Sequence, residues 1–83
     1  MRLPRELSGI QLARLLESHG YVLTRRKGSH MRLTTLNQGE HHITIPDHDS
    51  LRIGTLSSIL SDVAEHFGIQ REELIERLFG AER

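Results

Sequence analysis

The stretch of the chain best suited to do chemistry is RRKGSH, residues 25–30. Three cations lie at a tight turn, which is predicted over residues 27–29, and a histidine follows the turn. Cationic side chains bind phosphate groups, and an imidazole can take up or release a proton near neutral pH. Cleavage of RNA without a metal ion needs both properties. The pattern therefore predicts a functional site at this turn.

His30 is the candidate acid/base group of this site. In the strand predicted after the turn, Met31 and Leu33 are apolar and Arg32 is polar, and side chains of a strand point alternately to opposite faces. This alternation predicts an exposed His30 on the same face as Arg32. A neutral imidazole there can act as the base for a ribose 2′-hydroxyl, and its charged form can pass a proton to the leaving oxygen. The alternative is an ordinary surface histidine beside a turn.

The residues around His30 are candidate phosphate ligands, and the predicted RNA-binding set is Arg25, Arg26, Lys27, Ser29 and Arg32. The four cations have no acid between them, which favours contact with an anion. Alternatively, they form a solvated strand edge that discourages aggregation. Ser29 completes the turn, and no Asp or second His is placed to make it a covalent nucleophile.

Three further histidines raise a metal-site hypothesis, in the segments GEHH, residues 39–42, and PDHD, residues 46–49. Adjacent residues of a strand point to opposite faces, so His41 and His42 cannot easily bind one ion. His42 with His48 stays open as a pair, but a tight site needs a third or fourth ligand. We therefore expect no metal and no cofactor, with His42 and His48 as secondary groups near the RNA.

The whole chain is small and has no formal net charge. Its 83 residues predict a single domain, residues 1–83, and its 11 basic and 11 acidic residues exclude a general basic field for nucleic acid. The charges are unevenly spread, however. Acids crowd the end of the chain, at Glu65, Glu72, Glu73, Glu76 and Glu82.

Composition also indicates a compartment. There are no cysteines, so neither a disulfide nor a thiolate metal site is available, which fits a reducing cytosol. No apolar run approaches the ~20 residues of a membrane span, and residues 1–6 lack the apolar stretch of a signal peptide. We therefore expect a cytoplasmic protein without a membrane partner.

Hydrophobic periodicity and turn residues predict the elements that position the site. Ser8 and Gln11 have the spacing of a capping box, which marks the start of a helix. The predicted elements are a helix from Ser8 to Gly20, strands over residues 21–26, 30–36 and 41–45, a helix capped at Gly54-Thr55 and ended by Gly68, and a helix over residues 71–79. The order α-β-β-β-α-α predicts an α+β fold with helices over one face of a three-stranded antiparallel sheet.

The segment VAEHFGIQREEL, residues 63–74, resembles a helix-turn-helix of the kind that reads DNA. A recognition helix needs cations or amides toward the DNA, whereas this one carries Glu72, Glu73 and Glu76. We therefore interpret the apolar residues of this region as core: Phe67, Ile69, Leu74 and Leu78. Its acidic surface is then available for contact with a protein.

Five short phrases occur along the chain in a fixed order: SG at residues 8–9, GYxL at 20–23, RxxGSH at 25–30, TIPxH at 44–48 and GTLxxIL at 54–60. Together they resemble a HicA-type toxin, the small partner of a two-gene toxin–antitoxin pair. The resemblance runs from about Ser8 to Leu78. Two features depart from the family pattern: Ile53 stands where a proline commonly precedes Gly-Thr, and the second helix is extended through residues 61–66.

The resemblance implies a double-stranded-RNA-binding-domain-like sandwich and an endoribonuclease that acts on mRNA, with His30 as its catalytic residue. It also implies a HicB-like antitoxin that covers the His30 face, so an oligomer with this antitoxin is compatible with the sequence. Two alternatives from other classes stay open. One is a non-catalytic double-stranded-RNA-binding module, which shape alone permits. The other is a protein-interaction domain that works through its acidic helical end.

Overall fold

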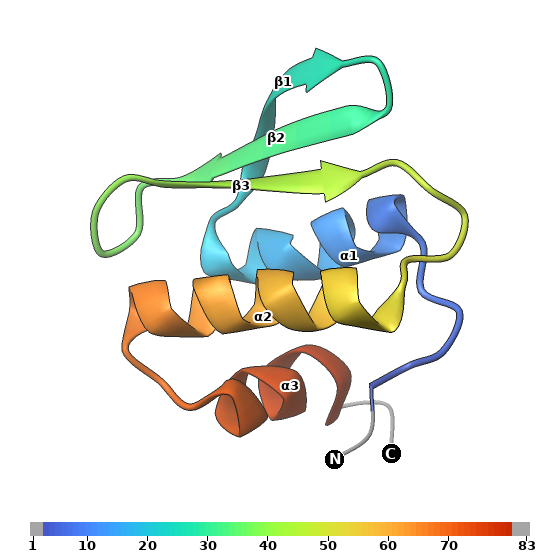
Figure 1. The fold of residues 1–83 in the computed structure, drawn as a ribbon. Coiled ribbons are helices and arrows are strands. Elements are labelled where there is room, and N and C mark those ends of the chain that lie inside the picture. The colour runs from blue at the N-terminus through green and yellow to red at the C-terminus, as the bar shows by residue number, and fades with distance from the viewer. Residues whose placement is uncertain (1–2, 81–83) are drawn as a thin grey trace.

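The chain folds into one antiparallel sheet, in the order β1-β2-β3, with helices on one of its two faces (Figure 1). The structure is a computed structural model that describes residues 3–80. Its elements are α1 (Gly9–Leu15), the 3₁₀ turn η1 (Leu16–His19), β1 (Val22–Lys27), β2 (His30–Thr35), β3 (His41–Pro46), α2 (Ile53–Phe67) and α3 (Arg71–Phe79). This confirms the predicted α+β class and element order, and the strand ends lie within one residue of those expected.

Three layers are visible in Figure 1. The sheet lies on top, α1 and α2 run side by side against it, and α3 packs on the side of α2 that faces away from the sheet. Among residues 3–80, one face of the sheet, which we call the outer face, therefore carries no helix. No helix within this range is long and apolar enough to cross a membrane.

The first helix starts and stops as its sequence predicts. The Ser8 hydroxyl accepts the backbone N–H of Gln11 at 3.0 Å, and the Gln11 side chain accepts the N–H of Ser8 at 2.9 Å, so the capping box is present. Gly20 ends η1 with φ of +86°, a conformation that residues with a Cβ rarely adopt. Gly9 is needed for a different reason, because a Cβ there would collide with the carbonyl of Pro46.

Strand alternation sends apolar side chains to the core and polar ones to the outer face. Met31 and Leu33 of β2 and Ile43 and Ile45 of β3 are buried, as is Thr35, whose hydroxyl donates to the carbonyl of His19 at 2.9 Å. They meet buried residues from the helices, among them Leu12, Leu16, Leu56, Leu60 and Val63. The predicted alternation of both strands is confirmed.

The two C-terminal helices correct one expectation and confirm another. α2 begins at Ile53, and Arg52 is its N-cap without a side-chain hydrogen bond, so the predicted cap at Gly54-Thr55 is wrong. Those residues lie inside the first turn because the Arg52 carbonyl already accepts the N–H of Leu56 at 2.9 Å. The interpretation of the helix-turn-helix-like segment as core is confirmed: Leu74 and Leu78 are buried, and Phe67 and Ile69 pack against the core.

Candidate functional site

A β-bulge in β1 decides which cations reach the outer face. β1 pairs regularly with β2 as far as Leu23 and then skips Thr24, so that Arg25 pairs with Arg32. A bulge of this kind reverses the alternation of the residues that follow it. Arg25 and Lys27 therefore point to the outer face, although unbroken alternation along β1 would have sent both of them to the inner one.

His30 and three residues of the predicted RNA-binding set meet around one shallow hollow on the outer face. Arg25, Lys27, His30 and Arg32 line it together with Thr44, and its volume is about 340 Å³. Lys27 is the cross-strand partner of His30, and Arg32 is that of Arg25. We call this feature the His30 hollow. His30 is exposed there, as alternation predicted, and it shares the hollow with two arginines and one lysine.

Arg26 belongs to the same predicted set but lies elsewhere. It pairs with Met31 on the inner face at the edge of the sheet. Its guanidinium donates to the Asp47 carboxylate at 2.9 Å and to the carbonyl of Gly28 at 3.4 Å. The Arg26 side chain therefore lies away from His30, and its positive charge is already paired with the Asp47 carboxylate.

Ser29 completes the turn between β1 and β2. Its carbonyl oxygen accepts the backbone N–H of Asp47 at 2.6 Å, and its side chain is exposed. Asp47 thus holds the turn twice, through the Ser29 carbonyl and through the Arg26 side chain. These contacts fix the backbone directly before His30 against the loop that follows β3.

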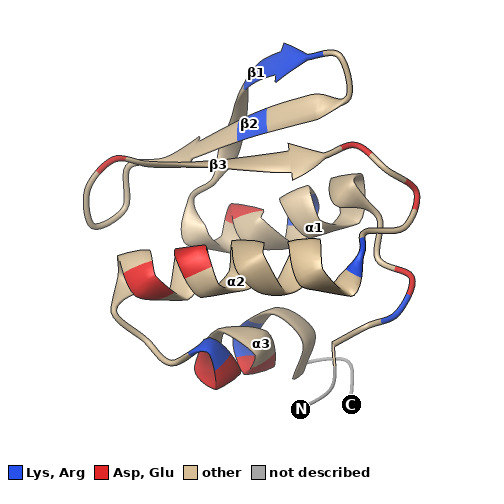
Figure 2. Cartoon of the chain, viewed as in Figure 1, with Lys and Arg blue, Asp and Glu red and all other residues tan. Residues whose placement is uncertain are grey.

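The charges that cancel in the sum are unevenly distributed in space. Figure 2 shows basic positions at the end of β1 and within β2, whereas the helical side carries both acidic and basic positions and the loops at the two ends of β3 carry acidic ones. An anion that approaches the bare face of the sheet therefore meets positive charge, despite 11 basic and 11 acidic residues overall.

Comparison with known families decides what kind of protein this is. The family model described as "HicA toxin of bacterial toxin-antitoxin" matches residues 9–64, which is more than half of the chain and includes the whole sheet. The chain belongs to the HicA toxin family. It is thus the toxin of a toxin–antitoxin system, whose partner is an antitoxin. No curated protein and no solved structure matches the chain significantly.

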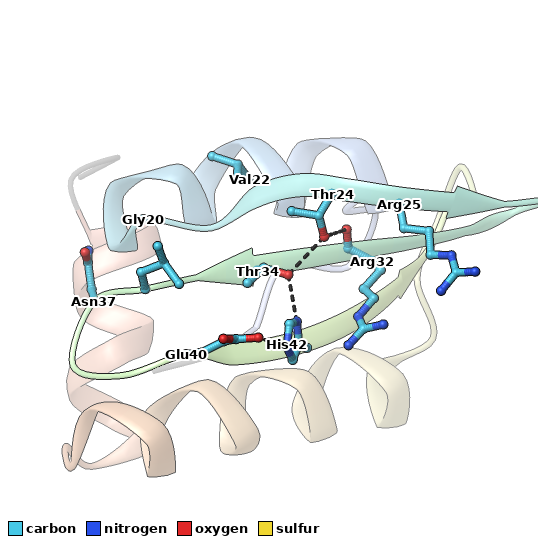
Figure 3. Close-up of a pocket in the computed structure, with 10 residues that line it drawn as sticks. Gly20, Val22, Thr24, Arg25, Arg32, Thr34, Asn37, Glu40 and His42 are labelled. Carbon is cyan, nitrogen blue, oxygen red and sulfur yellow. Dashed lines mark hydrogen bonds and ion pairs between the residues drawn. The ribbon is translucent and has the colours of Figure 1, made fainter.

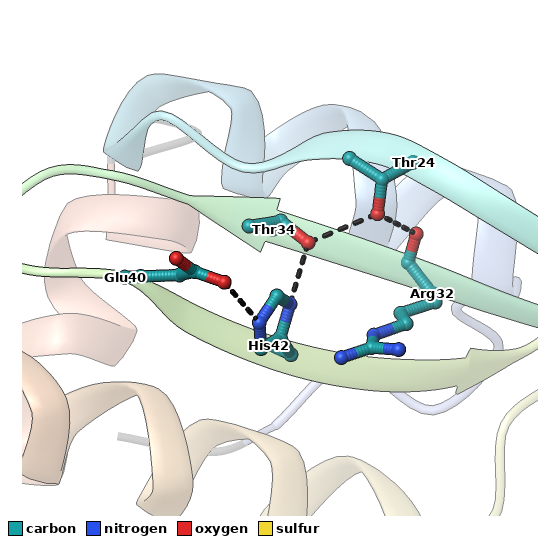
Figure 4. Close-up of polar contacts among 5 residues, drawn as sticks. All are labelled: Thr24, Arg32, Thr34, Glu40 and His42. Carbon is teal, nitrogen blue, oxygen red and sulfur yellow. Dashed lines mark hydrogen bonds and ion pairs between the residues drawn. The ribbon is translucent and has the colours of Figure 1, made fainter.

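A second group of polar side chains continues across the outer face of this HicA-family toxin (Figure 4). The Glu40 carboxylate lies 2.7 Å from Nε2 of His42, and the Thr34 hydroxyl lies 2.7 Å from Nδ1 of the same ring. Thr34 Oγ1 is in turn 2.9 Å from Thr24 Oγ1. Strand alternation places His42 on the outer face, whereas its contact with Glu40 depends on the turn before β3, which alternation alone does not predict.

His41 points the opposite way, as expected for its neighbour in the strand. Its Nδ1 lies 2.8 Å from the hydroxyl of Tyr21, its Nε2 lies 3.1 Å from the Asp62 carboxylate, and its ring stacks on His66 with centroids 4.4 Å apart. Burial and then the Asp62 charge raise the pKa of Tyr21 to about 12. This cluster ties the sheet to α2 and takes no part in the outer face.

The metal-site hypothesis gains no support from the arrangement of the histidines. Within residues 3–80, no group of three or more His, Cys, Asp or Glu side chains is placed to hold an ion. Both ring nitrogens of His42 contact protein groups, and His48 is exposed in the loop after β3, outside the residues that line the His30 hollow.

Proposed function

We propose that this HicA-family toxin is an endoribonuclease that cleaves mRNA without a metal ion and uses His30 as its acid/base. The observation that carries the proposal is the His30 hollow, in which an exposed imidazole stands among three outward cations on a face that no helix covers. Membership in a family of toxins supports a destructive activity of this kind.

The chemistry assigned to the hollow needs one proton carrier and positive charge. His30 takes the proton of a ribose 2′-hydroxyl, whose oxygen then bonds to the adjacent phosphorus. The bond from phosphorus to the 5′ oxygen breaks, and that oxygen receives a proton from the imidazolium or from water. The products are a 2′,3′-cyclic phosphate and a 5′-hydroxyl. Cations around the phosphorus stabilise the charge of the transition state.

The phosphate ligands proposed from the geometry are Arg25, Lys27 and Arg32, which line the hollow with His30. Arg26 and Ser29 are assigned an indirect part. Through Asp47 they hold the turn that positions His30, and they need no contact with RNA for this.

The partner proposed for this face is a HicB-like antitoxin, in the cytoplasm, that covers the His30 hollow and forms an oligomer with the toxin. An acidic surface complements the cations there and speeds association. The apolar sides of α1 and α2 are already buried against the sheet, so they offer little for a partner to bind.

The products of the reaction test the proposed function directly. Purified toxin incubated with mRNA in EDTA should cut it and leave 2′,3′-cyclic phosphate ends, because none of the steps above uses a divalent ion. Loss of cleavage in EDTA with recovery on addition of one divalent ion would overturn the mechanism. Binding of double-stranded RNA without any cleavage would favour the alternative of a binding module.

A further inference from the structure

A larger hollow adjoins the His30 hollow on the outer face (Figure 3). Its volume is about 690 Å³, within the range of small-ligand sites, and it shares Arg25 and Arg32 with its neighbour. The rest of its wall includes Val22, Leu36, Thr34, Glu40 and His42. We call it the His42 hollow. The two hollows form one continuous surface across the three strands.

His42 is held rigidly in this hollow. A carboxylate can only accept hydrogen bonds, so Nε2 of His42 donates to Glu40, while Nδ1 is in hydrogen-bond contact with the hydroxyl of Thr34. These two contacts, on opposite sides of the ring, fix its orientation. Since both of its nitrogens contact protein groups, the ring offers a ligand its flat face, and 36% of the side chain is exposed.

The surroundings of His42 suit a flat ligand. Val22 and Leu36 are 58% and 75% exposed, and both of these apolar side chains line the same hollow as His42. An ordered ring with apolar neighbours is the kind of surface on which proteins stack the unpaired bases of single-stranded RNA.

Charge along the surface sets the direction in which a strand of RNA lies. Arg25 and Arg32 stand where the two hollows meet, and Glu40 lies beside His42 on the side away from the arginines (Figure 3). Phosphate groups are attracted to the arginines and repelled by the carboxylate. A base, which has no charge, is the part of a nucleotide that fits beside Glu40.

His42 does not serve as a second proton carrier at the phosphate bound by His30. His30 and Thr34, the cross-strand partner of His42, are four residues apart on β2, which corresponds to about 13 Å at roughly 3.3 Å per residue. An acid and a base must each lie within about 3 Å of the proton they move. His42 is therefore assigned to a neighbouring nucleotide.

We propose that the His42 hollow is a nucleobase subsite, which stacks one base of single-stranded RNA on His42 and prefers bases that carry an exocyclic amino group. The preference comes from Glu40: one carboxylate oxygen bonds His42, and the other has no partner among residues 3–80, so it can accept an amino N–H. Uracil has no amino group. This proposal rests on the proposed function, because it assigns the base specificity of the same RNA site.

The test compares two RNA oligonucleotides of equal length, oligocytidylate and oligouridylate, as substrates in EDTA. The parent toxin should cleave the first with a kcat/KM about tenfold higher or more, since a hydrogen bond to a charged group is worth a factor of this size. Glu40→Gln, a change of similar shape at a residue whose side chain is 62% exposed, should bring the ratio close to one. His42→Ala should lower kcat/KM for both substrates about tenfold.

The matched control is Glu17→Gln, at an exposed glutamate of η1 on the helical side of the sheet. It removes the same charge and should leave both the rate and the ratio unchanged. Thermal unfolding of each variant shows whether it folds. A ratio that stays the same in Glu40→Gln overturns the subsite while the endoribonuclease stands.

Binding of the 2′-O-methyl forms of both oligonucleotides, measured by fluorescence anisotropy, separates the two proposals. These forms cannot be cleaved because the attacking hydroxyl is blocked. Preferential binding of oligocytidylate that Glu40→Gln abolishes supports the subsite even if the toxin cuts nothing. A parent toxin that neither binds nor cuts either RNA overturns both proposals. Variants that change affinity for the antitoxin alone would make this surface a protein contact and overturn the subsite.

Discussion

At the scale of single residues, the site depends on which side chains are exposed on the outer face and which are already bonded to other protein groups. His30 and Arg26 lie four residues apart, yet they have opposite surroundings. His30 is exposed among cations on the outer face, whereas Arg26 bonds Asp47 at 2.9 Å at the inner edge. This difference leads to two predictions about substitutions to alanine.

The first prediction concerns His30. We expect His30→Ala to lower the rate of RNA cleavage by about 10²–10⁴, the usual contribution of a general acid or base. The free energy of unfolding should change by no more than about 0.5 kcal/mol, because the residue is exposed. Cleavage of a labelled mRNA and urea denaturation check the two quantities. A folded variant that cuts RNA at the parental rate would remove His30 from the mechanism.

The second prediction compares two neighbouring arginines. The affinity for single-stranded RNA should fall as salt is added, with a slope of about −0.7 in log–log form for each phosphate neutralised. Arg25→Ala should make this slope shallower by roughly that amount. Arg26→Ala should change it less, since the Arg26 guanidinium is paired with Asp47 away from the hollow. Equal effects of the two variants would contradict the assignment of Arg25 as a phosphate ligand.

At the scale of elements, the packing of η1 against α2 and α3 contains a group that responds to pH. The His19 ring lies edge-on to Phe67 with centroids 5.2 Å apart, and its Nε2 is 3.4 Å from the guanidinium of Arg77. A guanidinium can only donate, so Nε2 accepts and the ring is neutral. Burial and then the Arg77 charge lower the pKa of His19 from its ordinary value of 6.5.

The third prediction follows from the sign of this shift. Below pH 6.5 the unfolded chain takes up a proton at His19 that the folded protein resists, so the free energy of unfolding falls as the pH drops through this range. His19→Gln should reduce that loss, and the variant should gain on the parent between pH 7 and pH 5. Urea denaturation at pH 7, 6 and 5 measures the difference. A parent and variant that lose stability in parallel would contradict the prediction.

At the scale of the whole molecule, cations lie on the bare sheet, while the helical side carries acids and bases together (Figure 2). The helices bury their apolar sides against the sheet and against one another. The outer face is therefore the part of the toxin that a partner can cover without disturbing the core. This leads to an expectation about how the antitoxin inhibits.

The fourth prediction is that the antitoxin occupies the outer face and leaves the toxin folded. Hydrogen exchange of the toxin should slow on antitoxin binding between residues 25 and 45, with no acceleration in α1 or α2. Amides of the β1 edge and of the two turns should respond most, because they lack partners in the sheet ladder. Protection confined to residues 65–79 would instead place the interface on the acidic helical end and make inhibition indirect.

Local signals in the sequence determined the elements of this protein and the exposure of its central histidine. The capping box of Ser8 and Gln11, the stop at Gly20 and the alternation along β2 each depend on residues a few positions apart, so one sequence suffices to predict them. The run RxxGSH, within a fixed order of other phrases, indicated the family.

Only the tertiary structure decided which side chains share the face with His30. The bulge at Thr24 has no glycine or other local signal; it exists because β1 pairs with β2, and the Thr24 hydroxyl there bonds the Arg32 carbonyl at 3.3 Å and contacts Thr34. It turns Arg25 and Lys27 outward. The ion pair of Arg26 with Asp47 likewise joins residues 21 positions apart. Contacts of this kind depend on strand pairing and loop closure, which no local pattern encodes.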